Sequence, residues 1–340
     1  MTPSDTPDTE GLMEALQAEL LRGLPEVEHP NPEIARYRQL LGDYPRRSGK
    51  LVRGTLTLLS TLAHGGSFGQ ALPAATGIEL FQSWVLIHDD IEDDSLIRRG
   101  SPALHRQVGM PVALNVGDGL HVHMWRQLIE ARLPPSVLRE FLSTISRTAE
   151  GQHLDLAWVE NGKLDVSEDE YLQMVRLKTA WYTVVTPLRL GALLLDLEPS
   201  PAFTVAGLDL GAAFQIRDDV LNLTSMDSEA GGYGKEAAGD LVEAKRTLIL
   251  AHFFAVAGTA AADEARDRLL KPSQERTSGD VDWLLAAARA TGSISYAQEQ
   301  AERLAESSLS ALRSVLADLP VQAAARSMFD LLNTLAHRTR

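Results

Sequence analysis

The stretch from Ile87 to His105, IHDDIEDDSLIRRGSPALH, places a cluster of carboxylates directly before two arginines. In a helix, residues four apart share a face, so Asp89 and Asp93 point the same way about one turn apart. Mg²⁺ in proteins prefers a few carboxylate oxygens together with waters and substrate phosphates. The cluster, which includes Asp90, therefore predicts one half of a magnesium clamp for a diphosphate.

The two arginines, Arg98 and Arg99, extend this interpretation, because guanidinium groups match the geometry of phosphate oxygens. An acidic face followed by a basic turn is also common on solvated helix surfaces. The context favours a site: the run WVLI, residues 84–87, is apolar and directly precedes the carboxylates. The acidic turn is therefore expected at the end of a buried helix.

A second acidic stretch, FQIRDDVLNL, spans residues 214–223. It repeats the arrangement of the first, because Asp218 and Asp219 follow an apolar segment with helical periodicity. Two buried helices that each end in an acidic turn suggest facing halves of one site. We therefore expect Asp89, Asp93 and Asp218 to converge at one end of a cavity.

Cations lie before another apolar segment. The sequence YPRRSGKLVRG puts Gly49, Lys50 and Arg53 at the expected opening of a helix that runs to about Ala63. Free backbone amides and the helix dipole at such an opening attract anions, and the two cations would add to them. A basic helix cap without a ligand explains the same residues.

Two more polar pairs lie within helical segments. Gln152 and Asp155, in GQHLDLAW, share a helix face, where they either shape the polar end of a site or satisfy hydrogen bonds in the core. Lys178 and Thr179 fall in the middle of a helix that begins after the N-cap signal SEDE at residues 167–170. A lysine among apolar residues either pairs with an anion or extends to solvent, and extension to solvent is the usual arrangement.

The composition excludes several classes of function. The chain has 340 residues, of which 44% are apolar, enough for a sizeable core, and a formal net charge of −14, which argues against a nucleic-acid surface. There is no cysteine, so disulfides, thiolate metal sites and cysteine nucleophiles are excluded. His121 and His123 do not predict zinc, because alternate residues point to different faces of a helix and no third ligand follows at a recognisable spacing.

The chain has no recognisable targeting signal. Its start, MTPSDTPDTEG, lacks a basic and an apolar region, and no apolar run reaches the roughly 18 residues of a membrane span, so we expect a cytoplasmic protein. Residues 1–30 are expected to form a loosely held arm around one amphipathic piece, Leu12–Leu24. Residues 31–340 would form the functional domain.

Helical periodicity dominates, and no convincing strand pattern occurs, so the expected fold is all-α and single-domain. A segment rich in Gly and charge, from about 225 to 247, predicts a mobile loop over the site. The expected helices are Ile34–Leu41, a helix to Ala63, Ala71–Asp94, Val112–Leu133, Val137–Val159, Ser167–Leu195, a helix from Phe203, and further helices after Leu248 with breaks near Pro272, Gly292 and Pro320.

Six motifs resemble, in order, those of the trans-isoprenyl diphosphate synthases of the polyprenyl synthetase family: GKxxR, DDxxD with RRG, GQxxD, KTA, FQIRDD, and GK with GDLxEAK. The likeness covers about residues 33 to 335, and FQIRDDVLNL and GDLVEAK are most similar to geranylgeranyl diphosphate synthases. It implies a helical bundle around a central cavity, usually homodimeric. The implied reaction joins isopentenyl diphosphate to an allylic diphosphate (dimethylallyl, geranyl or farnesyl).

The resemblance also implies roles for matching positions. Asp89 and Asp93 would bind two Mg²⁺ ions and Asp218 a third, with Asp219 in support. Two departures from the family pattern stand out: Gly54 replaces a frequent proline, with little expected effect, and Asn222 replaces an aspartate, with the loss of one outer carboxylate. Isopentenyl diphosphate would be held by Gly49, Lys50, Arg53, Gln82 and Arg99, and the allylic substrate by Arg98, Lys178, Lys235 and Lys245, with Thr179 and Gln215 also in the substrate site.

The chemistry fits these residues. Breaking the allylic C–O bond requires that the negative charge on the departing diphosphate be neutralised, which cations in a dry site achieve. The double bond of isopentenyl diphosphate then attacks the allylic cation, and the released diphosphate takes the proton. A nucleophilic triad is unnecessary, and the sequence shows none.

Product length depends on what lies beneath the first acidic turn. Trp84 and Val85 lie five and four positions before Asp89, about one helical turn back, where they would form the floor of the cavity. Trp84 as ordinary core packing fits the composition equally well. By resemblance, a bulky residue at this position stops growth near C20, so geranylgeranyl diphosphate is expected, with farnesyl diphosphate (C15) second. A class I terpene cyclase and a silent subunit of a heteromeric synthase are the remaining alternatives.

Overall fold

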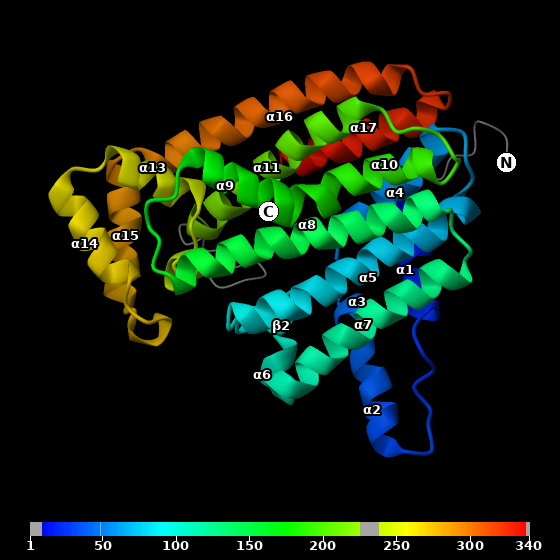
Figure 1. The fold of residues 1–340 in the computed structure, drawn as a ribbon, viewed down its shortest axis with the longest axis horizontal. Helices are drawn as coiled ribbons and strands as arrows, with labels where there is room; N and C mark the ends of the chain where they lie inside the picture. The colour runs from blue at the N-terminus through cyan, green and yellow to red at the C-terminus, as the bar shows by residue number, and fades with distance from the viewer. Residues whose placement is uncertain (1–8, 48, 225–237, 338–340) are drawn as a thin grey trace. The chain divides into compact units, whose positions relative to one another are not determined.

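The structure is a computed structural model, and it describes residues 9–47, 49–224 and 238–337. Within these ranges the chain is helical apart from one hairpin, so the predicted all-α fold class is confirmed (Figure 1). The hairpin pairs β1 (Ile97–Arg98) antiparallel with β2 (Ser101–Pro102), where only a loop was predicted. The helices are α1 (Thr9–Arg22), α2 (Pro32–Leu41), α3 (Asp43–Arg46), α4 (Val52–Ala63), α5 (Phe68–Glu92), α6 (Leu104–Val108), α7 (Met110–Glu130), α8 (Pro135–Glu160), α9 (Glu168–Val175), the π-helix η1 (Arg176–Val185), α10 (Thr186–Leu193), α11 (Pro201–Thr224), α12 (Gly239–Val242), α13 (Leu248–Val256), α14 (Thr259–Leu269), the 3-10 helix η3 (Ser273–Glu275), α15 (Ser278–Ala290), α16 (Ser293–Ala317) and α17 (Gln322–Ala336).

Packing divides the chain into two compact units, each assembled from separate stretches of sequence. The first comprises residues 1–144, 182–204 and 311–332, and the second comprises residues 145–181, 205–310 and 333–340. The first acidic motif therefore belongs to one unit and the second acidic motif to the other. The expected division of the chain at residue 31 stays a prediction.

In the first unit, α5 packs against both α4 and α7, and α4 also packs against α10. The start of α5 is fixed by a capping box between Ser67 and Gln70. α10 lies very close to α4, since a Cβ added at Gly191 would come within 2.1 Å of Ser60 Oγ. This packing holds the carboxyl end of α5, which carries the first acidic motif.

The N-terminal arm contains more structure than the sequence predicted. Its amphipathic piece forms α1, and Leu12, Leu16 and Leu20 are at most 1% exposed against neighbouring helices of the first unit. Their spacing of four residues places all three on one face of α1, where burial stabilises the helix. The part of the arm from Thr9 to Arg22 is therefore packed rather than loosely held.

Two predicted helices differ locally from the structure. α4 begins at Val52, because Leu51 adopts a left-handed backbone with φ of 42°, so Gly49 and Lys50 precede the helix. The helix predicted from Ser167 to Leu195 has the expected capping box but changes to π geometry at Arg176. Sequence periodicity does not distinguish such a change, because it depends on packing.

Two glycines make room for η1 in the second unit. A Cβ at Gly151 of α8 would lie 2.3 Å from the backbone nitrogen of Lys178. A Cβ at Gly211 of α11 would lie 2.4 Å from Ala180 Cα. The wider π-helix thus packs directly on backbone from both neighbours, which fixes where Lys178 is presented.

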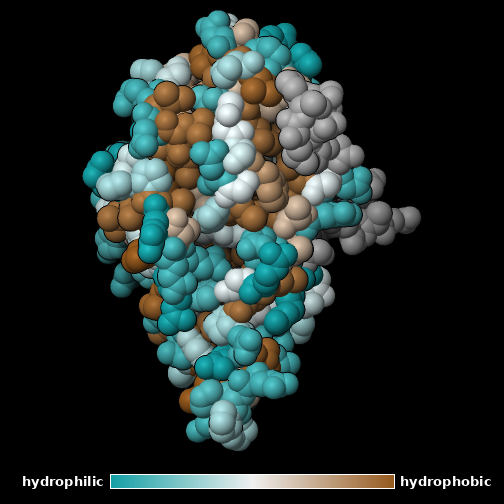
Figure 2. Space-filling view, turned by 90° about the vertical axis from the view of Figure 1, so that its right-hand side faces the viewer, coloured by the Kyte–Doolittle hydropathy of each residue, from teal (hydrophilic) through white to brown (hydrophobic). Residues whose placement is uncertain are grey.

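On the face drawn in Figure 2, apolar side chains are interspersed with hydrophilic ones. Among the helices of the described ranges, none combines the length and the apolarity needed to cross a bilayer.

Candidate active site

The first acidic motif lies at the carboxyl end of α5, and its carboxylates have different environments. Asp90 is fully buried: its Oδ1 accepts a hydrogen bond from Arg98 Nε at 2.8 Å, and its Oδ2 accepts one from the Tyr44 hydroxyl. Asp89 and Asp93 are only partly buried. Asp89 Oδ2 lies 3.5 Å from Arg98 Nη2. The two carboxylates predicted to bind metal are thus partly accessible to solvent, whereas Asp90 is buried and accepts hydrogen bonds from Tyr44 and Arg98.

Tyr44 is a site component that the sequence did not reveal as one. Besides Asp90, its hydroxyl contacts the Leu104 backbone N–H at 3.3 Å, and the Arg47 guanidinium lies 4.5 Å from its ring centroid. Arg47 in turn donates to the Arg98 carbonyl at 3.1 Å. These contacts fasten α3 to the hairpin and to α5. Burial and the negative charge of Asp90 raise the pKa of Tyr44, so its hydroxyl stays a donor.

Arg98 and Arg99, both predicted to bind phosphate, are already engaged with the protein. Arg98 is 8% exposed and pairs with the carboxylates of α5. Arg99 Nη1 donates to the Arg47 carbonyl at 2.9 Å. A Cβ at Gly49 would come within 2.8 Å of Arg99 Nη2, so a side chain there would displace the Arg99 guanidinium. Their phosphate contacts stay a prediction.

Arg53 and its neighbour Gly54 are buried at the start of α4. Arg53 Nη2 donates to Thr183 Oγ1 at 2.8 Å. The Gly54 N–H donates to Glu79 Oε1 at 2.8 Å, and burial raises the pKa of Glu79. A Cβ at Gly54 would lie 2.8 Å from the Ala75 carbonyl oxygen. The expectation that this replacement matters little for phosphate binding stays a prediction, but in this structure a proline would collide with Ala75 and remove the donor to Glu79.

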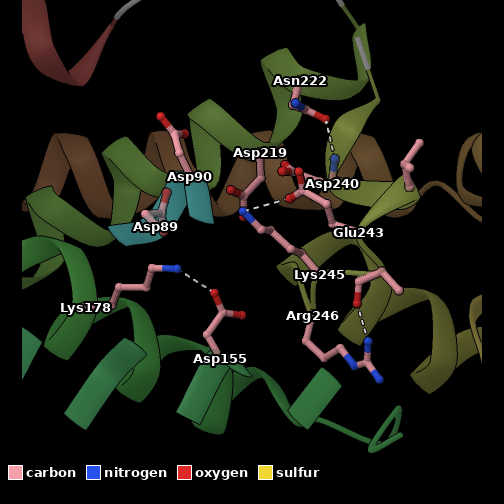
Figure 3. A network of polar contacts seen from close by, with 12 residues as sticks. Asp89, Asp90, Asp155, Lys178, Asp219, Asn222, Asp240, Glu243, Lys245 and Arg246 are labelled. Carbon is pink, nitrogen blue, oxygen red and sulfur yellow. Dashed lines mark hydrogen bonds and ion pairs between the residues drawn. The ribbon is translucent and has the colours of Figure 1, made fainter. Parts of the chain in front are cut away.

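The second acidic motif lines a cavity of about 60 Å³ in the second unit, which is room for a few waters or a hydrated ion. Its walls combine carboxylates with cations, as Figure 3 shows for several of them. The lining residues are Asp155, Tyr171, Met174, Val175, Lys178, Thr179, Gln215, Asp218, Asp219, Asp240, Lys245, Arg246 and Thr247.

A chain of hydrogen bonds orients Asp219 in this cavity. Tyr171 donates to its Oδ2 at 2.7 Å, and Gln215 Nε2 donates to its Oδ1 at 2.8 Å. The Gln215 side-chain oxygen in turn accepts from Thr179 Oγ1 at 3.0 Å. Thr179, Gln215 and Asp219, all predicted site residues, are thus brought together. Tyr171 was missed, because a tyrosine after the SEDE cap carries no signal of a partner on another helix.

Lys178 does not extend to solvent, although the sequence favoured that arrangement. Its Nζ donates to Asp155 Oδ2 at 2.6 Å, and the two side chains are 19% and 9% exposed (Figure 3). The π-helix presents Lys178 toward Asp155 of α8. Of the two roles considered for Asp155, the polar end of a site fits this contact better than a hydrogen bond within the core. Asp155 shapes the polar lining of the cavity together with a cation.

Asn222 has a role other than a lost metal ligand. It is 2% exposed, and its Oδ1 accepts the backbone N–H of Asp240 at 3.2 Å (Figure 3). The amide thereby anchors the segment that begins at α12 and carries Asp240 and Lys245 into the cavity. Arg246 fastens the other end of that segment by donating to the carbonyl oxygens of Lys163 and Trp158 at 2.6 and 3.1 Å. An aspartate at 222 could accept the same N–H, but it would add a negative charge next to Asp240.

The donor set of the cavity suits a divalent cation. Burial is the largest cause that raises the pKa of Asp219 far above its ordinary range, and repulsion by the Asp240 carboxylate is the next. A cation bound in the cavity would relieve this repulsion. Among the described residues, no group of three or more His, Cys, Asp or Glu is arranged to hold a metal ion by itself. An ion held here therefore needs other ligands. Mg²⁺ suits such a site, because it keeps waters and takes substrate phosphates alongside one or two carboxylates.

Replacing Asp219 with asparagine is expected to flatten the pH dependence of stability of the metal-free protein. A pKa raised above that of a free aspartate, about 4, contributes stability that is present below about pH 4 and is lost as the pH rises through the raised pKa. Melting temperatures measured in chelator should thus fall more steeply with rising pH in the wild type. The control is Asp209→Asn, on the same helix and paired with Arg176 outside the cavity. Parallel curves for wild type and Asp219→Asn would contradict the raised pKa.

Lys235 and residues 225–237 of the predicted mobile loop lie outside the described residues. Residues 238–247 of that loop were expected to be mobile, but they are packed, because they contain α12 and are held by the hydrogen bonds of Asn222 and Arg246. The remaining predicted site residues lie within the described ranges, and they differ in exposure and in contacts. Lys50 precedes α4 and is exposed, and Gln82 is half-buried on α5. Lys245 lines the cavity and pairs with Glu243 at 3.0 Å.

Comparison with known proteins identifies the family. Residues 35–287 match the polyprenyl synthetase family. The chain belongs to this family. A polyprenyl synthetase is a prenyltransferase, and this one is a short-chain trans-prenyl diphosphate synthase with the isoprenoid synthase fold. The resemblance seen in the sequence is thus confirmed, and the family depends on magnesium.

Several individual polyprenyl synthetases are similar to this chain. It is 35% identical over 273 residues to a geranylfarnesyl diphosphate synthase of Natronomonas pharaonis, covering 79% of this chain and 75% of that one. It is 32% identical over 269 residues to a geranylgeranyl pyrophosphate synthase of Geoglobus acetivorans, covering 77% and 80%. A solved geranylgeranyl pyrophosphate synthase from Corynebacterium glutamicum, complexed with isoprenyl diphosphate and magnesium, matches with a TM-score of 0.81 and 26% identity over 96% of this chain and 99% of that one.

Proposed function

We propose that this prenyltransferase condenses isopentenyl diphosphate head-to-tail with an allylic diphosphate and releases geranylgeranyl diphosphate (C20). The main support for this reaction is the cavity of the second unit, where Lys178 and Lys245 lie among carboxylates from α8, α11 and α12. Cations beside carboxylates suit the binding of a magnesium diphosphate, because the cations contact the phosphate oxygens and the carboxylates bind the metal. Support for C20 comes from relatives that are geranylgeranyl diphosphate synthases and from Trp84 before the first motif.

The residues divide the work as follows. Asp89 and Asp93 would hold two Mg²⁺ ions, and Asp218 would hold a third. When bound, the ions neutralise the charge that develops on the departing diphosphate. Lys178, positioned by Asp155, grips the allylic diphosphate and keeps it oriented.

The other diphosphate needs its own cations. Lys50 and Arg53, with Gln82 and Arg99, hold isopentenyl diphosphate, while Arg98, Lys235 and Lys245 complete the grip on the allylic substrate. Asp90 and Asp219 position their neighbours from inside the protein, as their hydrogen bonds indicate. No side chain of the protein needs to act as a nucleophile.

We further propose a homodimer. The helix α7 leaves apolar side chains uncovered, since Met110, Val122 and Ile129 are 59%, 65% and 61% exposed. Several large exposed apolar side chains on one helix are typical of an interface with a partner. Sedimentation at micromolar concentration tests this, and a monomer would contradict it.

Product analysis tests the proposed reaction. The purified protein should consume isopentenyl diphosphate with dimethylallyl, geranyl or farnesyl diphosphate only when Mg²⁺ is present, and chromatography of the dephosphorylated product should show a C20 alcohol. A C15 product would favour farnesyl diphosphate synthase, and a C25 product would match the geranylfarnesyl relatives. A hydrocarbon formed without isopentenyl diphosphate would indicate a cyclase. Absence of turnover in a folded protein would indicate a silent subunit.

Removing one cation at a time should separate the two substrates. Lys50→Gln is expected to raise the KM for isopentenyl diphosphate chiefly, and Lys178→Gln the KM for the allylic substrate chiefly. Glutamine keeps a hydrogen-bond donor, so the Asp155 carboxylate is not left buried without one. Contacts made equally in the ground and transition states change KM more than kcat. Steady-state kinetics with each substrate varied in turn measure this, and equal changes in both KM values for both variants would refute the assignment.

A further inference from the structure

Trp84 is surrounded by aromatic rings within the first unit. Its ring stacks on that of His121 from α7, with 4.0 Å between centroids and an interplanar angle of 6°. It meets Phe81 and His88 edge-on, with centroids 5.4 and 5.9 Å away. The parallel contact is the closest of the three, and it comes from another helix.

His121 is itself held in a defined orientation. Trp125 Nε1 donates to His121 Nε2 at 2.9 Å, so Nε2 is the acceptor and the ring proton lies on Nδ1. Burial lowers the pKa of His121, which keeps the imidazole neutral despite the nearby Asp118. The ring that faces Trp84 therefore has one tautomer and one plane.

Trp84, by contrast, has no polar anchor. Its indole N–H is buried, and no acceptor lies within hydrogen-bond distance among the described residues. Buried indole N–H groups usually find a partner, and that partner then fixes the ring. Among the described residues no hydrogen bond fixes the indole, and of its ring contacts the stack on His121 constrains its plane most directly.

We propose that His121 is a positioning residue for product length, because it fixes the plane of the Trp84 indole, and that Trp125 supports it. This inference rests on the proposed function in one respect, that Trp84 limits the growing isoprenoid tail. If His121 loses its ring, the indole can rotate into the space left beside α7. The floor that Trp84 is proposed to form beneath the first acidic motif then opens although Trp84 is still present.

Product chromatography of purified variants tests the inference. His121→Ala is expected to shift the main product to a chain one or more five-carbon units longer, in the direction of Trp84→Ala. His121→Phe keeps a flat ring for the stack and should restore the wild-type length. The double variant Trp84→Ala/His121→Ala should match Trp84→Ala alone, because His121 acts only through Trp84. His64→Ala, which removes another histidine of the first unit whose ring contacts Phe203 rather than Trp84, is the matched control and should leave the product unchanged.

The outcomes separate the inference from the proposed function. If Trp84→Ala lengthens the product and His121→Ala does not, the positioning role is wrong and the floor assignment stands. If neither changes the product, the floor assignment itself is wrong. If His121→Phe behaves like His121→Ala, or if the double variant exceeds Trp84→Ala, the imidazole acts by a route other than stacking and the inference is overturned. Melting temperatures measured alongside identify loss of folding, for which His121→Phe provides the folded variant.

Discussion

Asp218→Ala is expected to lower turnover by a factor of about 100 to 1000, which is the usual cost of losing one well-placed electrostatic group. Asp218 lines the cavity of the second unit, and its negative charge adds to that of Asp240 in raising the pKa of Asp219. These carboxylates repel one another unless a cation neutralises them. Removing one of them takes away a proposed metal ligand and also relieves repulsion.

The same substitution should therefore leave the metal-free fold intact or more stable. Melting in chelator is expected to be unchanged or higher than in the wild type, while the stabilisation on adding Mg²⁺ and a diphosphate should shrink. Asp209→Ala on the same helix is the control, because its carboxylate pairs with Arg176 outside the cavity. Wild-type turnover by Asp218→Ala would contradict the metal role, and a lower melting temperature in chelator would contradict the repulsion. Asp89→Ala is expected to lower turnover by a similar factor.

The fold class and the local placement of each acidic motif were predictable from sequence. Periodicity gives the faces of α5 and α11, so the partly buried positions of Asp89 and Asp93 follow from their spacing. The family match over residues 35–287 confirms the resemblance carried by the six motifs. That the two motifs face each other stays a prediction.

Partners on other helices were not predictable. Asp155 could not be matched to Lys178, because the pairing depends on the π-helix, and the π-helix depends on glycines of α8 and α11. Tyr44 and Asn222 were missed as supports for the same reason, since each acts through a residue distant in sequence. Spacing rules describe neighbours along one helix, whereas these contacts arise from packing between segments.

Long-range contacts also changed how single residues are interpreted. Gly54 looked neutral as a departure from the family pattern, yet its N–H satisfies the buried carboxylate of Glu79. Arg98 looked free for phosphate, yet in this structure it pairs with Asp90. For Arg98 to contact a diphosphate as well, its Nη2 must be shared between the protein and the substrate. Motif matching assigns the residue, and only the structure shows which atoms are already engaged.

Trp84→Ala is expected to lengthen the product by one or more five-carbon units. The indole is half-buried one turn before Asp89, held between His121, Phe81 and His88. Its removal leaves a space beneath the first acidic motif into which a longer isoprenoid tail fits. The cost in stability should be about 3 kcal/mol, the low end for a large aromatic side chain, because the wild-type ring is not fully buried. A tail that fills the space recovers part of that cost by binding.

Chromatography of the dephosphorylated products measures the shift, and Val85→Ala supplies a graded comparison, because it removes a smaller side chain from the neighbouring position on α5. The expected order of product length is Trp84→Ala longest, then Val85→Ala, then wild type. An unchanged product from a folded Trp84→Ala enzyme would mean that growth stops elsewhere. Tyr182 would then be the next residue to test, because its ring already packs edge-on against Phe81 at 5.4 Å and lies under the Arg53 guanidinium.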